Sequence, residues 1–148
     1  MSAYVSAGGG FLLAVLWLDL MFDSQLIGQR GEPPEEVLAS ISAYYARVTT
    51  AARPMNRLIA SVMLATLGVI VAELIKPGSP TWVALSSLAL TTAATGLAGA
   101  RTVPSAVRLG TRRDPVMHQG RLARAILHQH VFCAGAIVGV LVLQLAFA

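Results

Sequence analysis

Charge is scarce in this chain. Of its 148 residues only 12% are Asp, Glu, Lys or Arg, whereas 55% are hydrophobic, and the mean hydropathy is +0.68. A soluble domain is typically about one-quarter charged, so these values exclude an ordinary water-soluble globular domain. Cysteine is nearly absent as well. Cys133 stands alone, which excludes a disulfide within the chain, and we expect it to pack as a small hydrophobic side chain.

Basic residues are also missing before the first apolar run. That run continues well beyond the roughly 7–15 apolar residues of a signal peptide, so we expect it to stay attached as a membrane span. The formal net charge of +4 comes from basic residues that flank apolar runs. Nucleic-acid binding needs instead a basic patch with groove-reading or aromatic elements, and we predict none.

The apolar residues fall into four runs, each close to the ~20 residues that cross a ~30 Å hydrocarbon layer. We therefore predict an all-α integral membrane protein with a single domain, in which four transmembrane helices joined by short connections form an antiparallel bundle. The lipid bilayer is its first expected partner. The predicted spans cover residues of about 3–27, 58–75, 81–103 and 122–148.

The segment of about 34–52, between the first two spans, has a different periodicity. Its larger apolar or aromatic residues fall at positions 37, 38, 41, 44, 45 and 48, which is the stripe of an amphipathic helix. Pro34 followed by Glu35 and Glu36 is a favourable helix start. We expect this helix to lie along the cytoplasmic membrane surface or against the bundle's cytoplasmic end, and to serve packing rather than substrate recognition.

The basic residues predict the topology. Ten of the eleven Lys and Arg residues lie around the first and third connections, and Lys76 alone lies at the other end. By the positive-inside rule, we expect a multi-pass protein of the cell (inner) membrane with its N-terminus and C-terminus outside the cytoplasm. The third connection, residues 104–120, is strongly basic. This fits topology and anionic lipid headgroups, or else an entrance for an anionic substrate or acidic partner.

Small residues at helical spacing predict contacts between spans, because helices associate in lipid by close approach. On the fourth span the Gly135–Gly139 pair continues backward through Phe132 to His128, which predicts that His128 faces a neighbouring helix. On the third span the corresponding ridge consists of Ser87, Thr91, Thr95 and Gly99.

Two acids interrupt the first span, Asp19 and Asp23, one helical turn apart on one face. An ionisable residue inside the membrane is costly and suggests a role and a partner. At 1.5 Å per residue we place Asp19 ~9 Å and Asp23 ~3 Å inside the layer, and His128 and His130 of the fourth span at ~3 Å and ~6 Å. Asp23 is then expected to pair with Arg124 or His128.

This cluster has three interpretations. One is an ion pair that fixes helix register and topology. Another is a metal or haem site that uses His128 or His130 with Asp19 and Asp23, although the two histidines are two residues apart and point in nearly opposite directions. The third is a general acid/base or proton-relay pair acting on a lipophilic substrate, with Asp19, Asp23, His128 and Arg124 as the candidate residues. The cofactor is left open.

Glu73 lies three residues before Lys76, near the outer end of the second span. We expect it to be a surface charge beside the turn, with an ion site at the outer face as the alternative.

The stretch Arg101-Thr102-Val103-Pro104 follows the third span. Together with the span count and the length, it resembles the anthrone-oxygenase-like superfamily of small four-span membrane proteins, which often carry an Asn-Val-Pro-containing stretch there; this chain has Thr102 at the asparagine position. The resemblance implies a cofactor-free oxygenase or a related enzyme of lipophilic substrates. It transfers no catalytic residue to this chain.

A bundle with abundant small-residue faces and no soluble domain favours an accessory or anchoring subunit of a larger membrane complex, bound to other membrane subunits or to itself. An alternative is a membrane enzyme, oxygenase-like or acid/base, for a lipophilic small molecule. A second alternative is a small proton-coupled transporter in which a first-span acid exchanges protons for a cationic substrate.

Overall fold

The computed structural model describes residues 1–51, 53–75 and 79–148. Residue 52, the predicted end of the amphipathic helix, and Lys76 lie outside these ranges. Helices account for nearly all of the described chain, and it contains no strand. The elements are α1 (Ser2–Asp23), η1 (Ser24–Leu26), α2 (Glu35–Ala46), η2 (Arg47–Ala51), α3 (Arg53–Ile75), α4 (Thr81–Leu97), η3 (Ala98–Thr102), α5 (Val103–Thr111) and α6 (Val116–Ala146).

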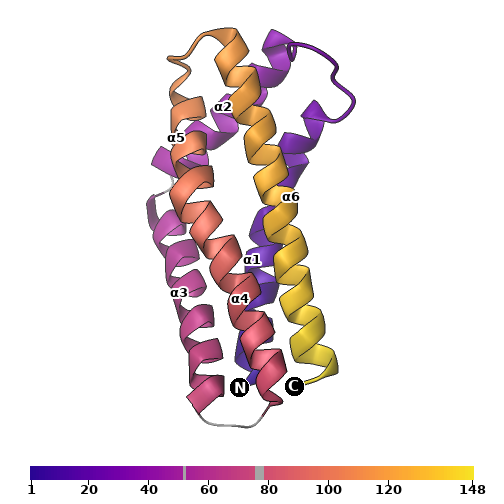
Figure 1. Ribbon diagram of the computed structural model, residues 1–148. Helices are drawn as coiled ribbons and strands as arrows, with labels where there is room; N and C mark the ends of the chain where they lie inside the picture. Colours follow the sequence, from indigo (N-terminus) through magenta and orange to yellow (C-terminus); the bar gives the residue numbers. More distant parts are fainter. Residues whose placement is uncertain (52, 76–78) are drawn as a thin grey trace.

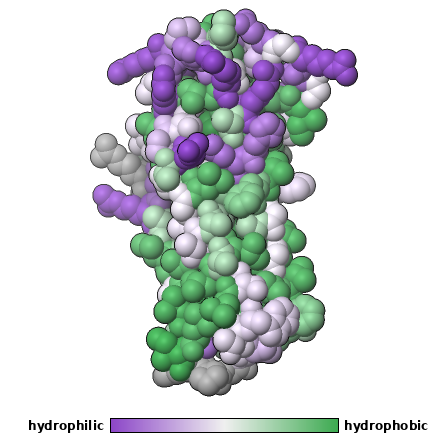
Figure 2. Space-filling view, in the orientation of Figure 1, coloured by the Kyte–Doolittle hydropathy of each residue, from purple (hydrophilic) through white to green (hydrophobic). Residues whose placement is uncertain are grey.

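Four helical stretches in the described residues are long and apolar enough to cross a membrane: Ser2–Leu26, Pro54–Ile75, Thr81–Thr111 and Val116–Ala146. They form an antiparallel bundle with the N-terminus and the C-terminus at the same end, while α2 crosses the opposite end (Figure 1). The predicted all-α membrane bundle is therefore confirmed. The third and fourth stretches extend beyond the predicted spans at the α2 end, where the surface is hydrophilic (Figure 2).

Proline explains the joints between helical segments. Pro104 lacks a backbone N–H, and its ring clashes with the carbonyl of the residue four positions earlier. The π-helical segment η3, Ala98–Thr102, comes just before Pro104 and absorbs this defect without ending the helix. Likewise Pro34 caps α2 in an extended conformation, with two glutamates in the first helical turn.

The amphipathic helix α2 packs at one end of the bundle, as its stripe predicted. Leu38, Ile41 and Tyr45 are almost completely buried, in a hydrophobic cluster that includes Leu109 of α5 and Ile126 of α6. The backbones of α2 and α5 approach closely at Gly110, where a Cβ atom would lie 2.8 Å from the backbone nitrogen of Ala46. Gly110 thus allows α2 to lie directly on α5.

The small residues of α4 and α6 have two different environments. Ser87 and Thr91 are buried, and a Cβ at Gly139 would lie 3.2 Å from Leu90 Cδ1, so this part of both patterns packs α4 against α6. Gly99 and Gly135 are open, because a Cβ there would meet nothing within 4 Å. The bundle therefore uses only part of its small-residue faces internally.

Candidate functional site

The two acids of α1 each accept a hydrogen bond from a tyrosine of α2. The Tyr44 hydroxyl donates to Asp19 Oδ1 and the Tyr45 hydroxyl to Asp23 Oδ1, both at 2.7 Å. The ring of Tyr44 also stacks on Phe22, with centroids 4.0 Å apart, which fixes its orientation. Two adjacent tyrosines of α2 therefore bind two acids that lie one helical turn apart on α1.

His130 of α6 lies between the two carboxylates. Its Nδ1 is 2.7 Å from Asp23 Oδ2, and its Nε2 is 3.8 Å from Asp19 Oδ2. Asp23 is completely buried, and His130 is 6% exposed. A buried carboxylate needs such partners, because an unpaired charge inside the membrane costs several kcal/mol. One polar cluster thus joins α6 to α1 and α2, which lie far from it in the sequence. We call it the Asp–His–Tyr cluster: Asp19, Asp23, Tyr44, Tyr45 and His130.

The tyrosines act as donors over a wide pH range. Burial, and next the negative charge of Asp23, raise the pKa of Tyr45 far above its ordinary value. Burial and then the charge of Asp19 do the same for the pKa of Tyr44. Both phenols consequently keep their protons and stabilise the carboxylates.

The expected pairing of Asp23 with Arg124 or His128 is wrong. Arg124 donates instead to the backbone carbonyl oxygens of Gln29 and Gly31, and His128 is exposed. The reason is the register of α6: its buried face runs through Ile126, His130, Cys133 and Ile137, at the alternating spacing of four and three. The stripe through His128 and Phe132 faces outward, and Phe132 is 51% exposed.

The metal hypothesis placed an ion on His128 or His130 together with Asp19 and Asp23. The exposed position of His128 removes the first of these two choices. Within the described part of the chain, no group of three or more His, Cys, Asp or Glu side chains has an arrangement that could hold a metal ion.

Sequence reasoning missed both tyrosines as partners of the acids. They were recognised only as part of the apolar stripe of α2. The available signal was the presence of two adjacent tyrosines on the apolar stripe of α2 and of two acids inside the apolar run of α1. A phenol buried by packing needs a hydrogen-bond partner.

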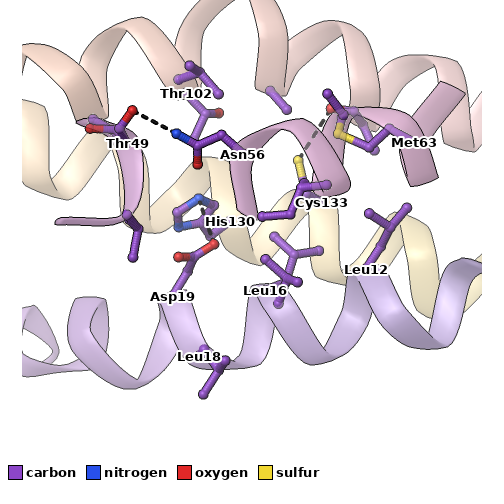
Figure 3. Close-up of a pocket in the computed structure, with 18 of the residues that line it drawn as sticks. Leu12, Leu16, Leu18, Asp19, Thr49, Asn56, Met63, Thr102, His130 and Cys133 are labelled. Carbon is purple, nitrogen blue, oxygen red and sulfur yellow. Dashed lines mark hydrogen bonds and ion pairs between the residues drawn. The ribbon is translucent and has the colours of Figure 1, made fainter. Parts of the chain in front are cut away.

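A cavity of about 350 Å³ adjoins the cluster (Figure 3). Asp19, Tyr44, Tyr45 and His130 lie at its polar end together with Thr49 and Asn56, and most of the other lining residues are apolar. Cys133 lies on its wall, with its thiol 3.6 Å from the backbone oxygen of Ala94. The cavity can therefore accommodate a molecule that is apolar along most of its length and polar at one end.

Glu73 is a second buried acid, near the opposite end of the bundle. It is only 3% exposed, so the expectation of a surface charge is wrong. Its Oε2 accepts a hydrogen bond from Gln144 Nε2 at 3.1 Å, and the same nitrogen lies 3.1 Å from Ser87 Oγ. This contact ties α3 to α6 and α4.

The basic third connection is partly neutralised by its own chain. Arg108 binds both carboxylate oxygens of Asp114 at 2.7 Å, and Arg112 binds Glu35 Oε1 at 2.6 Å. The hydrogen bonds from Arg108 hold the pKa of Asp114 below its usual value. These exposed pairs link the α5–α6 loop and the start of α2.

Comparison with known families identifies the chain's relatives. A model of the SHR3 chaperone family, described as ER membrane protein SH3, matches residues 2–147. The chain belongs to this family. No curated protein and no solved structure matches it.

The family match corrects two expectations. The predicted resemblance to the anthrone-oxygenase-like superfamily is wrong, because the family that matches nearly the whole chain is a different one. The predicted location in the cell (inner) membrane is also wrong, because the family is described as a protein of the endoplasmic reticulum membrane. The multi-pass arrangement holds, and the match supports a chaperone-like membrane protein that interacts with other membrane proteins.

Proposed function

We propose that this protein is a chaperone-like accessory protein that holds transmembrane segments of other membrane proteins. The family match over residues 2–147 carries this proposal. It is supported by the architecture, because the described residues form one helical bundle of four membrane-spanning stretches with α2 packed at one end.

The outward face of α4 and η3 supplies a surface for a foreign helix. A row of exposed small residues runs along it, and a Cβ at Gly96 or Gly99 would meet nothing within 4 Å. Small residues let helix backbones approach closely, which is a main source of helix affinity in lipid. We call this row the α4 small-residue face; it consists of Ala89, Thr92, Ala93, Gly96, Gly99 and Ala100.

The Asp–His–Tyr cluster has a supporting role in this proposal. It ties α1, α2 and α6 together inside the bundle. A fixed bundle presents its outer face with little loss of conformational freedom on binding, which favours association. Arg124, expected in the cluster, instead holds the loop at Gln29 and Gly31.

Site-specific crosslinking tests the proposal. A photoreactive amino acid at Ala93, on the α4 small-residue face, should crosslink to other membrane proteins in native membranes. The matched control is the same amino acid at Leu64, a lipid-facing residue of α3 that is 66% exposed. Equal products from both positions, or none from Ala93, would contradict the proposed role of this face.

A substitution pair gives the quantitative form of the test. Gly96→Leu should reduce the amount of other membrane proteins that co-purify with the chain in mild detergent at least several-fold, because the added side chain prevents close approach of a partner helix. Gly68→Leu on α3 is the control, since Gly68 is equally open. Migration of the parent chain alone, with no partner recovered, would also count against an accessory role.

A further inference from the structure

The cavity beside the Asp–His–Tyr cluster has a long apolar part and a short polar end. Leu12 and Leu16 of α1, Met63 of α3 and Ile137 of α6 line the apolar part. Asp19 and His130 lie together at the polar end (Figure 3). A volume of about 350 Å³ is within the range of small-molecule sites. The shape of the cavity therefore suits an amphiphilic molecule. The chemistry of its head group follows from the residues at the polar end.

The polar end offers hydrogen-bond acceptors. The Tyr44 proton is directed to Asp19, the Thr49 hydroxyl donates to the backbone oxygen of Tyr45 at 2.6 Å, and Asn56 Nδ2 donates to the backbone oxygen of Thr49 at 2.7 Å. Tyr44 and Thr49 thus donate within the protein, and Asn56 uses one of its two N–H groups there. Asp19 Oδ2 keeps its lone pairs for a ligand, and so does the side-chain oxygen of Asn56.

His130 adds a further acceptor. His130 is only 6% exposed, and its Nδ1 forms a hydrogen bond with Asp23 Oδ2 at 2.7 Å. In the tautomer that donates Nδ1–H to that carboxylate, Nε2 carries a lone pair. Nε2 makes no hydrogen bond within the described chain, and it lies 3.8 Å from Asp19 Oδ2 at the cavity wall.

Acidic groups outnumber basic groups around the polar end. Two carboxylates, Asp19 and Asp23, face one imidazole, and among the side chains that the structure describes only His130 places a basic nitrogen within 4.0 Å of either acid. The polar end therefore holds two acidic groups and one basic group. A cation beside Asp19 would be paired with a carboxyl group, as a charged group inside a membrane usually is.

The cavity also reaches the lipid-facing surface. Leu18 of α1 is 56% exposed, and Ala60 of α3 is exposed, yet both line the cavity. A molecule dissolved in the bilayer can thus enter between α1 and α3.

We propose that this cavity binds a lipophilic cation, a molecule with an apolar body and a protonated amine head. The ammonium group donates hydrogen bonds to Asp19 Oδ2 and His130 Nε2, and the apolar body lies along Leu16 and Met63. This site is separate from the α4 small-residue face, and its test is independent of any client protein.

The first experiment compares three probes of equal chain length on the purified full chain in detergent at pH 7.5: octylammonium, octanol and octanoate. Ligand binding raises the unfolding midpoint with increasing ligand concentration, and the concentration dependence gives an apparent affinity. Octylammonium should bind at least tenfold more tightly than octanol, and octanoate should not stabilise the protein. Equal affinities for the amine and the alcohol would overturn the proposal.

Variants then locate the site. Asp19→Asn should weaken octylammonium binding at least tenfold and leave octanol binding within about twofold. Asp114→Asn, which changes an acid on the α5–α6 loop outside the cavity, is the control and should leave both affinities unchanged. Ala60→Phe retains both acids and obstructs the opening, so it should weaken both probes. Unchanged octylammonium binding in folded Asp19→Asn or in Ala60→Phe would refute the assignment.

Discussion

Tyr45→Phe tests the energetics of the Asp–His–Tyr cluster with the smallest change available. The substitution removes one hydroxyl group and keeps the ring, so it creates little cavity. Tyr45 is 2% exposed, and its hydroxyl donates at 2.7 Å to Asp23, which is completely buried. A hydrogen bond to a charged group contributes about 1.5–3 kcal/mol, and a buried acceptor without its donor costs a similar amount. We therefore expect the free energy of unfolding to fall by about 2–3 kcal/mol.

The measurement is reversible unfolding of the purified chain in mixed micelles, with sodium dodecyl sulfate as the denaturant and tryptophan fluorescence as the signal. Tyr4→Phe is the matched control, because Tyr4 is 73% exposed and its hydroxyl makes no hydrogen bond within the described chain. It should change stability by less than about 0.5 kcal/mol. A double-mutant cycle with Asp23→Asn should give a coupling energy of about 0.5–3 kcal/mol. A Tyr45→Phe variant as stable as Tyr4→Phe, with no coupling to Asp23, would refute the reasoning.

Three further predictions use the same unfolding assay. The pKa of Tyr45 is raised in the folded protein, so its contribution to stability is complete below about pH 10, the ordinary pKa of tyrosine, and is lost as the pH rises above that value. Tyr45→Phe should therefore reduce the loss of stability between pH 9 and 11. An unchanged slope of unfolding free energy against pH would contradict the assignment. His130→Gln should destabilise by about 3 kcal/mol or more because it leaves the buried Asp23 and the partly buried Asp19 without their basic partner. His128→Gln should be nearly neutral, and equal effects would show that the register of α6 is misassigned. Gly110→Ala should destabilise by about 1–3 kcal/mol, because the new Cβ meets the backbone of α2. Gly68→Ala should be neutral or slightly stabilising, as expected at an open helix position. The reverse order of stabilities would exclude direct contact between α2 and α5.

Much of the fold follows from periodicity. Four long apolar runs need internal backbone hydrogen bonds in lipid, which restricts them to helices. The stripe that contains Leu38, Ile41 and Tyr45 specifies the buried face of α2. The helical extensions of α4 through η3 into α5 could not be placed by hydropathy, since the polar residues there lie beyond the apolar layer and the π-helical turn near Pro104 depends on local geometry.

The candidate site could be predicted only in part. The acids of α1 stand out in the sequence because a charge inside an apolar run is visible there, and in the structure Asp23 is completely buried and Asp19 partly buried. Their partner was misidentified because the choice between His128 and His130 depends on how α6 is rotated about its axis. The small-residue pattern through Gly135 and His128 predicted the wrong rotation, because both of these residues face outward.

Hydropathy and charge distribution, both readable along the chain, determined that this protein is an antiparallel membrane bundle with its basic residues concentrated at one end. Tertiary structure alone decided that Tyr44, Tyr45 and His130 meet Asp19 and Asp23, and that a cavity opens beside them. The physical reason is that lipid-exposed and buried helix faces are both apolar. Hydrophobicity therefore specifies the depth of a residue in the membrane, whereas its direction depends on side-chain packing between helices distant in sequence.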